Sequence, residues 1–389
     1  MSSDKVGLQQ EIDQRKKDGL FRQRQVMNSA QGPLIKIEHE TFINFSSNDY
    51  LGFANNENLK ACLIDAVSKY GIGAGSSQLL TGHLSPHKTL EGKLAQFLNR
   101  DAALVFPTGY QANLAIASAL INSKTVVLQD KLNHASLIDA ALLSRGRLVR
   151  YRHNDIEHLK TLMEKYKHQE LIIMTDGVFS MGGDCARLIE MSHLCKTYNA
   201  ILIVDDAHGI GVLGETGAGL LEELNLNQQQ VPLLVGTFGK SFGAAGAFVS
   251  GSKLHVEMFI QKARTYIYTT ALLPAIAATM IKAIDLIKEG NNLRKNIKNL
   301  IVQYRGLIKE YGLNSSESFS HIQPLIVGEP NKALALSKAL YKKKILVMAI
   351  RPPTVPKDTS RLRISITATH TEEQIKTLVY EINKANSIV

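Results

Sequence analysis

The sequence has no tryptophan, three cysteines and no long hydrophobic run. The cysteines, Cys62, Cys185 and Cys195, form no C-x-x-C pair and no cluster with histidine at zinc-binding spacing. We therefore expect neither a disulfide framework nor a metal site, and the low cysteine use fits a reduced, cytoplasmic setting. No run of 18 apolar residues occurs, so a membrane-spanning helix is not expected. The first residues are polar and of mixed charge, which argues against a signal peptide.

Positive charge is in surplus but is not gathered in one place. The 389 residues carry a formal net charge of +10, with 44% hydrophobic and 21% charged residues, an ordinary globular composition. A nucleic-acid-binding surface would cluster its basic residues and add aromatic ones, whereas here the basic residues are scattered. The surplus instead favours an anionic substrate or an acidic carrier protein.

Short β-rich runs alternate with helix-length segments through the middle of the chain. Helix-length segments such as Gln111–Ile121 and Leu188–Tyr198 separate the runs. This rhythm predicts an α/β fold with a mostly parallel sheet covered on both faces, whose ligands bind beyond the carboxyl ends of the strands. The predicted strands are Ala103–Phe106, Thr125–Gln129, Leu148–Arg152, Leu171–Thr175, Ala200–Val204, Pro232–Val235 and Ala247–Val249.

The pattern predicts three parts. An N-terminal helix and arm occupy residues 1–44, and a large α/β domain follows over 45–275. A smaller α+β domain is expected over 276–389. It would begin with a long helical stretch to about residue 311, continue with the strand-like runs IQPLIVG and ILVMAI, and end with a helix from Glu372.

Lys240 stands alone among small and apolar residues in VPLLVGTFGKSFGAAGAFVSGS (231–252). A lysine in a glycine-rich turn is ordinarily a solvated loop residue. A phosphate loop of the form G-x-x-x-x-G-K-[ST] would need glycine at position 234, where the chain has Leu234. The remaining interpretation is a desolvated amine, whose lowered pKa lets it attack a carbonyl and form a Schiff base.

A second motif, DDAHGIGVLG (205–214), follows the apolar run AILIV. It places Asp205 and His208 just past a predicted strand, and its tail is a formal G-x-G-x-x-G match. A dinucleotide-binding fingerprint has its first glycine directly after the strand, and the carboxylates at 205 and 206 would repel a pyrophosphate. The ordinary alternative for Asp205 is a cap on the following turn.

Pyridoxal phosphate (PLP) is a cofactor that would use all of these groups. It needs a Schiff-base lysine, for which Lys240 is the candidate, and a carboxylate on its pyridinium nitrogen, for which Asp205 is the candidate. His208 is then expected to bond the phenolate oxygen of the ring. Together the three residues predict a PLP site at the carboxyl edge of the sheet.

The phosphate and one ring face of PLP call for further residues. Gly109 and Tyr110 open a predicted helix, and the N–H groups at a helix N-terminus bind phosphate. Thr237 lies near Lys240 and would add its hydroxyl. His134, in KLNHASLIDA, is placed to stack on the ring, although a lone histidine is more often a surface or capping residue.

These residues stand in motifs that resemble the α-oxoamine synthase family of fold-type I, aspartate aminotransferase-like PLP-dependent enzymes. The resemblance covers nearly the whole chain, in the family's order. The motifs are NFSSNDYLG (44–52), TGYQANLA (108–115), LNHASLIDA (132–140), DGVFSMGGD (176–184), VDDAHGIGVLGETGAG (204–219), GTFGKSFG (236–243) and AIRPPTVP (349–356).

The resemblance implies a catalytic set and a wider cofactor site. Lys240 would carry the cofactor, Asp205 would pair with the pyridinium, and His134 would stack on the ring. His208 and Ser180 would lie on the phenolate side. The phosphate would be held by Gly109, Tyr110 and Thr237, and by Thr269 or Thr270 of a neighbouring subunit, because the family forms homodimers.

The resemblance also implies the substrates. AIRPPTVP and IQPLIVG are most similar to the members that condense L-alanine with a pimeloyl thioester, of CoA or of a carrier protein, in biotin biosynthesis. L-alanine would be held by Asn48, His134 and Arg363, since a guanidinium binds a carboxylate through two hydrogen bonds. Arg22 and Thr354 would contact the acyl substrate.

Other functions remain open from the sequence. The sister enzymes, 2-amino-3-ketobutyrate ligase and 5-aminolevulinate synthase, use glycine and a shorter acyl-CoA. A non-catalytic PLP-fold binding protein would not need the base that Lys240 provides. The chain also departs from the usual family pattern at Gly182, Arg187 and Gln78, which bears on substrate entry and not on the reaction.

Overall fold

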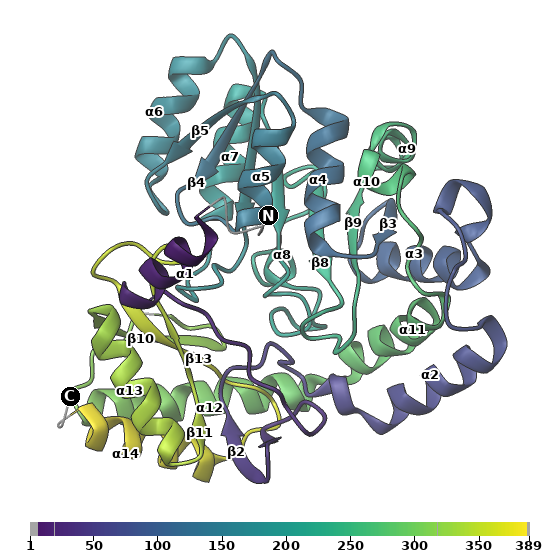
Figure 1. Ribbon diagram of the computed structural model, residues 1–389. Helices are drawn as coiled ribbons and strands as arrows, with labels where there is room; N and C mark the ends of the chain where they lie inside the picture. Colours follow the sequence, from purple (N-terminus) through teal and green to yellow (C-terminus); the bar gives the residue numbers. More distant parts are fainter. Residues whose placement is uncertain (1–6, 19, 317, 387–389) are drawn as a thin grey trace. The chain divides into compact units, whose positions relative to one another are not determined.

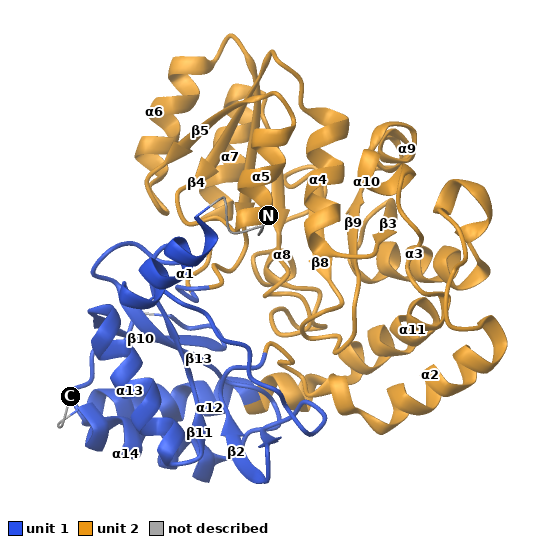
Figure 2. Cartoon of the chain, in the orientation of Figure 1, with its two compact units in different colours: residues 1–47, 181–183, 297–389 blue, residues 48–180, 184–296 orange. Residues whose placement is uncertain are grey.

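The structure is a computed structural model that describes residues 7–18, 20–316 and 318–386 (Figure 1). Its chain divides into two compact units (Figure 2). Unit 1 comprises residues 1–47, 181–183 and 297–389, and unit 2 comprises residues 48–180 and 184–296. The predicted domain limits, at residues 44/45 and 275/276, concern folding domains and stay a prediction.

Unit 2 is built on a seven-stranded sheet in the order β3-β9-β8-β7-β6-β4-β5. Neighbouring strands are parallel except for β9, which runs antiparallel to both β3 and β8. The predicted mostly parallel sheet is therefore confirmed. Its strands are β3 (Ala102–Phe106), β4 (Thr125–Asp130), β5 (Arg147–Tyr151), β6 (Glu170–Asp176), β7 (Ile201–Asp205), β8 (Leu233–Thr237) and β9 (Ala247–Gly251).

Helices pack on this sheet through small and branched apolar residues. In α4 (Gly109–Leu120) the fully buried residues Ala112, Ala115 and Ile116 are spaced by three and four, so they line one face of the helix. This face shares one apolar core with Leu137 of α5 (Ala135–Leu143) and Val235 of β8. The core fixes where the first turns of α4 and α5 begin, next to the ends of the strands.

Unit 2 contains further helices besides α4 and α5. The prediction of a helix over Leu188–Tyr198 is confirmed residue for residue. The helices are α2 (Glu57–Tyr70), α3 (Ser85–Phe97), α6 (Ile156–Tyr166), α7 (Leu188–Tyr198), α8 (Leu220–Glu223), α9 (Lys253–Lys262), α10 (Arg264–Ile267) and α11 (Pro274–Glu289), with the short turns η2 (Phe53–Asn55) and η3 (Gln78–Gly82).

Unit 1 contains two small sheets with helices. One sheet has the order β1-β2-β11 and the other β10-β13-β12. The strands are β1 (Leu34–Ile37), β2 (Glu40–Asn44), β10 (Ile322–Gly328), β11 (Ile345–Leu346), β12 (Met348–Ile350) and β13 (Ser360–Ser365). The helices are α1 (Leu8–Lys17), α13 (Pro330–Lys342) and α14 (Glu372–Asn386), and α12 (Asn291–Glu310) begins in unit 2 and continues in unit 1.

Polar residues end four neighbouring strands of the unit 2 sheet. Strands β4, β6, β7 and β8 close with Asp130, Asp176, Asp205 and Thr237. Because these strands are parallel, the four residues lie at one edge of the sheet. Three carboxyl groups and a hydroxyl at one edge of the sheet make this edge the candidate functional site. Among the described residues, no helix is both long enough and apolar enough to cross a membrane.

Candidate active site

Asp205 is held in a fixed orientation at the end of β7. Its Oδ2 accepts a hydrogen bond from Asn113 Nδ2 at 2.7 Å, and its Oδ1 accepts one from the Ala207 N–H at 3.0 Å. Asn113 is fully buried in α4 and also donates to Ser136 Oγ at 2.9 Å. Only 7% of Asp205 is exposed, so its carboxylate is aimed by packed neighbours and not by solvent.

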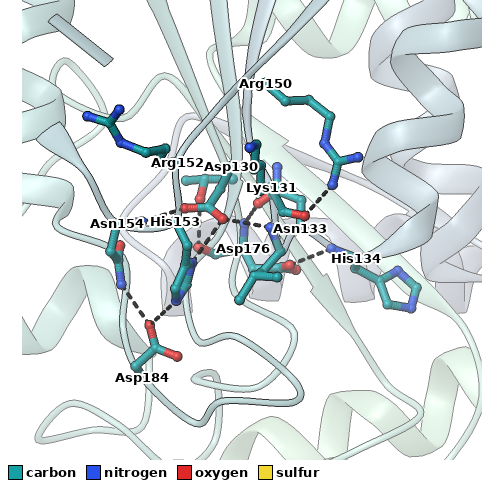
Figure 3. A network of polar contacts seen from close by, with 12 residues as sticks. Asp130, Lys131, Asn133, His134, Arg150, Arg152, His153, Asn154, Asp176 and Asp184 are labelled. Carbon is teal, nitrogen blue, oxygen red and sulfur yellow. Dashed lines mark hydrogen bonds and ion pairs between the residues drawn. The ribbon is translucent and has the colours of Figure 1, made fainter. Parts of the chain in front are cut away.

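His134 is the N-cap residue of α5, and its ring accepts a hydrogen bond from the first turn of the helix. The ring Nδ1 accepts from the Ser136 N–H at 3.3 Å and lies 2.8 Å from Ser136 Oγ. The His134 N–H donates to Asp176 Oδ2 at 2.6 Å (Figure 3). Burial lowers the pKa of His134, the charge of Asp205 opposes this, and Lys240 lowers the pKa further. The ring is therefore neutral near pH 7, which suits it to stack on an aromatic ring.

Asp176 is the counterpart of Asp205 on the neighbouring strand. The two residues pair in register between β6 and β7. Burial raises the pKa of Asp176 well above its ordinary value, and the charge of Asp205 adds to this effect. The charge of Lys240 lowers the pKa of Asp176. The charge of Lys240 thus acts on Asp176 at the end of β6 and on His134 at the start of α5.

Lys240 is part-buried on a tight turn between β8 and β9. Within this turn the Gly243 N–H donates to the Lys240 carbonyl at 2.8 Å, and the Ala244 N–H donates to the Phe238 carbonyl at 2.8 Å. Gly243 has φ +71°, and a Cβ there would lie 2.2 Å from the Ala54 nitrogen. Only glycine fits this conformation and this close approach, so GKSFG fixes the backbone beneath the Lys240 side chain.

His208 is held by a short chain of polar groups. Its Nδ1 lies 2.7 Å from the Tyr50 hydroxyl, which donates to Asn48 Oδ1 at 3.0 Å. Tyr50 and His208 are buried, and their rings lie 6.0 Å apart at an angle of 46°. The predicted substrate residue Asn48 and the predicted cofactor residue His208 are therefore joined through Tyr50, which the sequence analysis did not single out.

Gly109 and Thr237 lie side by side at the start of α4. A Cβ at Gly109 would be 4.0 Å from the Thr237 Cβ. Thr237 Oγ1 donates to the Gly246 carbonyl at 3.0 Å and accepts from the Gly239 N–H at 3.1 Å. The N–H groups at this helix N-terminus suit a phosphate, and the Thr237 hydroxyl would have to rotate away from the Gly246 carbonyl to donate its one proton to it. Tyr110 is 42% exposed, and its hydroxyl bonds Asp139.

The other predicted cofactor residues also belong to unit 2. Thr269 Oγ1 accepts from Gln111 Nε2 of α4 at 3.3 Å, and Thr270 pairs with Ser77 in an isolated β-bridge. Ser180 is part-buried and lies in the loop that follows β6. These three residues sit on loops, where side chains are placed by the scaffold around them.

The predicted substrate residues other than Asn48 and His134 belong to unit 1. Arg22 Nη2 donates to Thr354 Oγ1 at 3.3 Å, so these two residues meet although 332 positions separate them. Arg363 lies in β13, is 7% exposed, and donates from Nη1 to Ser365 Oγ at 2.8 Å. The structure thus brings Arg22 and Thr354 together, and their contact with the acyl substrate stays a prediction.

The G-x-G-x-x-G tail of the second motif has a structural explanation. Asp206 is fully buried, and a Cβ on Gly209, Gly219 or Gly177 would lie 2.1, 2.2 or 2.8 Å from one of its carboxyl oxygens. Asp206 Oδ2 accepts from the Leu220 N–H at 2.7 Å, and burial raises the pKa of Asp206 to about 8. Gly209 thus makes room for Asp206, while a Cβ on Gly211 would lie 2.4 Å from the Ser241 Cβ and one on Gly214 would lie 2.1 Å from Glu222 Oε2. Each glycine of the motif has a packing role, so the motif is not evidence of a dinucleotide site.

Several site residues were missed by sequence reasoning. Asp176 ends a strand as Asp205 does, so the repeated pattern of apolar run and aspartate could have revealed it. Asn113 and Ser136 carry no such signal, because they are ordinary helix residues whose roles depend on α4 and α5 packing together.

The comparisons with known proteins decide the family. The model of the aminotransferase class I and II family matches residues 40–382. The chain belongs to this family. Within aminotransferase class I and II, the chain is similar to the 8-amino-7-oxononanoate synthase of Thioalkalivibrio sulfidiphilus, with 46% identity over 379 residues and 97% coverage of each chain. The protein of the same name from Pseudomonas aeruginosa is 43% identical and covers 97% of this chain and 94% of its own.

Solved structures of this family have the same fold. A serine palmitoyltransferase of S. paucimobilis, with PLP–myriocin bound, has a TM-score of 0.93 at 30% identity and covers 100% of this chain and 99% of its own. The 8-amino-7-oxononanoate synthase of Francisella tularensis has a TM-score of 0.79 at 31% identity and covers 89% and 98%. The predicted fold-type I architecture is confirmed.

Proposed function

We propose that this chain is a PLP-dependent acyltransferase that condenses L-alanine with a pimeloyl thioester to give 8-amino-7-oxononanoate, CO2 and a free thiol, in biotin biosynthesis. The observation that carries the proposal is the meeting of Lys240, Asp205 and His134 at one edge of the unit 2 sheet. The charges of Lys240 and Asp205 both act on the pKa of His134. Relatives named 8-amino-7-oxononanoate synthase support the choice of reaction.

The residues at this edge fit PLP by their chemistry. An amine is available for the aldehyde, a carboxylate for the ring nitrogen, and a helix N-terminus with a hydroxyl for the phosphate. These are Lys240, Asp205, and α4 with Thr237. When bound, PLP supplies a ring that withdraws electrons from the α-carbon of the amino acid.

Each side chain then has a defined task. Asp205, oriented by Asn113, would hold the proton on the ring nitrogen. His134 would cover one ring face as a neutral group, and His208 and Ser180 would bind on the phenolate side. Lys240 Nζ would hold the cofactor, and as a free amine it would take the proton from the α-carbon of L-alanine.

The remaining residues would bind the substrates. Arg363 and Asn48 hold the carboxylate of L-alanine, and Arg22 with Thr354 contacts the acyl chain. A homodimer is part of the proposal, with Thr269 or Thr270 reaching the phosphate of the partner. The acyl donor is pimeloyl-CoA or a pimeloyl carrier protein, and the three free cysteines support a cytoplasmic location.

Borohydride reduction and peptide mapping test the cofactor assignment. The label should fall on Lys240, and Lys240→Ala should bind PLP without turnover. A label on a different lysine overturns the assignment.

Steady-state assays test the reaction. Each amino acid, L-alanine or glycine, is assayed with pimeloyl-CoA and separately with acetyl-CoA. L-alanine with pimeloyl-CoA should be fastest, because each buried methylene contributes about 0.8 kcal/mol. Faster release of CoA from glycine with acetyl-CoA would move the protein to the 2-amino-3-ketobutyrate ligase reaction.

A further inference from the structure

A second polar cluster lies at the same sheet edge, outside the residues assigned above. The His153 ring bridges two carboxyl groups. Its Nδ1 is 2.9 Å from Asp130 Oδ1, and its Nε2 is 2.9 Å from Asp184 Oδ2 (Figure 3). Asp130 ends β4 and is fully buried, whereas Asp184 lies in the loop after β6. We call His153, Asp130, Asp184 and Asn154 the His153 cluster.

Asn154 ties the same two carboxyl groups together. Its N–H donates to Asp130 Oδ2 at 2.8 Å, and its Nδ2 donates to Asp184 Oδ2 at 2.7 Å and to the Cys185 carbonyl at 3.0 Å. Two consecutive residues thus contact Asp130 and Asp184 at once. The cluster is a cross-link between two loops and not a single surface ion pair.

One of these loops carries His134. Asp130 Oδ1 accepts from the Leu132 N–H at 2.7 Å, and the Asp130 carbonyl accepts from the Asn133 N–H at 3.3 Å. Asn133 Oδ1 accepts from the Asp176 N–H at 3.2 Å, and Asp176 in turn accepts from the His134 N–H. Figure 3 shows this path from the His153 cluster to His134.

The other loop carries Ser180. The Asp184 carbonyl accepts from the Phe179 N–H at 2.9 Å, and Val178 pairs with Cys185 in a β-bridge. The Phe179 ring stands edge-on to His153, with centroids 4.6 Å apart. Fixing Asp184 therefore fixes the backbone just before Ser180.

The geometry requires a charged ring. Carboxylate oxygens only accept hydrogen bonds, so a histidine that bonds a carboxylate through each nitrogen must carry a proton on both. The pKa of His153 agrees with this. Partial burial alone would lower it, but the hydrogen bonds to Asp130 and Asp184 raise it to about 9.

Other charged groups near the cluster have their own partners. Arg152 Nε bonds Asp155 at 2.7 Å, and Arg150 bonds the Lys131 carbonyl. Burial raises the pKa of Tyr151, and that of Cys185 to about 12, so both are neutral at the pH of the assays below. Asp176, whose pKa is raised in part by the charge of Asp130, accepts a hydrogen bond from the His134 N–H.

We propose that His153, as an imidazolium, is a positioning residue that clamps the loop carrying His134 to the loop carrying Ser180, and so sets the spacing of two sides of the PLP site. The proposal rests on the roles given to His134 and Ser180 under the proposed function. The role of His153 predicts an effect on PLP affinity that does not depend on whether the acyl substrate is a pimeloyl thioester.

The experiment compares His153→Gln and Asp184→Asn with the matched control His193→Gln, an exposed histidine on α7. The PLP dissociation constant is measured from visible absorption between about pH 6 and about pH 10, with kcat and KM for L-alanine at neutral pH. Thermal unfolding of each variant checks that it is folded.

His153→Gln should weaken PLP binding about ten- to hundredfold, the usual effect of losing a charge-assisted hydrogen bond. In wild type, PLP binding should weaken further as the pH rises past about 9, because His153 then loses its proton. In His153→Gln this step in the pH profile should be absent. In Asp184→Asn the step should move to lower pH, because one acceptor of the imidazolium charge is lost. His193→Gln should match wild type.

Unchanged PLP affinity and an unchanged pH profile in His153→Gln would overturn the proposal. If His153→Gln does not fold, Asp184→Asn decides, because Asp184 is more exposed and Asn keeps its shape. A pH step that stays in place in Asp184→Asn would then overturn the proposal. If wild type binds PLP but does not condense L-alanine with pimeloyl-CoA, the proposed function fails. The PLP dissociation constants of the variants still test the role of His153 in that case.

Discussion

Asp205 and Asp206 are neighbours, yet they serve two different regions of unit 2. Asp205 faces the candidate site and is bonded by two N–H donors, at 2.7 and 3.0 Å, which suits a carboxylate. Asp206 faces the glycines of the following loop, where burial raises its pKa to about 8. The difference teaches that burial alone does not mark a carboxylate as part of the candidate site. What distinguishes the two is the direction of the side chain and the donors it meets.

The largest expected effect separates the two aspartates by kinetics. Asp205→Asn should slow α-proton exchange of L-alanine by at least about a hundredfold, because a charge-assisted contact worth roughly 1.5–3 kcal/mol is lost together with the ring proton it holds. Asp206→Asn should change the rate less than about tenfold, since Asn resembles the neutral acid. Deuterium exchange followed by proton NMR measures both. An Asp205→Asn protein that exchanges like wild type would show that Asp205 only caps a turn.

The next effect tests the glycines around Asp206. In Gly209→Ala the new Cβ would lie 2.1 Å from Asp206 Oδ1, so the free energy of unfolding should fall by about 1–3 kcal/mol, as for other overpacked sites. The matched control is Gly92→Ala in α3, where a Cβ meets no described atom within 4 Å. That change should stabilise by up to about 1 kcal/mol. Chemical denaturation measures both, and equal stability of the two variants would contradict the packing argument.

Most of this sheet could be predicted from the sequence, because apolar runs of strand length are a local pattern. The glycine-rich turn likewise points to Lys240 as a candidate, and its role in the site stays a prediction. The direction of β9 was not predicted, since strand pairing is set by distant partners. The strand-like run ILVMAI forms two strands in different sheets, because β11 pairs with β2 and β12 pairs with β13. The single helical stretch after Pro274 is two helices, separated at Gly290.

A separate effect should appear in the pH dependence of stability. Folded Asp206 keeps its proton up to about pH 8, whereas an unfolded aspartate loses it near 3.8. Between these values the folded state binds more protons, so this group lowers the free energy of unfolding as pH rises. The stability of Asp206→Asn relative to wild type should therefore increase from pH 4 to pH 8. A difference that does not vary with pH would show that Asp206 is ionised in the fold.

The smallest effect lies in unit 1. Arg22 is exposed and bonds Thr354, so Arg22→Ala should raise the KM for the thioester by less than about tenfold, as expected for an exposed charge. The affinity for L-alanine, measured from cofactor absorption without thioester, should not change. A loss of L-alanine affinity would instead place Arg22 in the amino-acid site.

The turn that carries Lys240 joins two strands that lie next to each other in the sheet. Strands β8 and β9 are paired from Leu234 with Ser250 to Thr237 with Ala247, so both ends of the turn are anchored by the same ladder. In the proposed reaction Lys240 Nζ would therefore move by rotation about the bonds of its own side chain, because the backbone on both sides of the turn is held by the sheet. No rearrangement of this loop would then be needed during turnover.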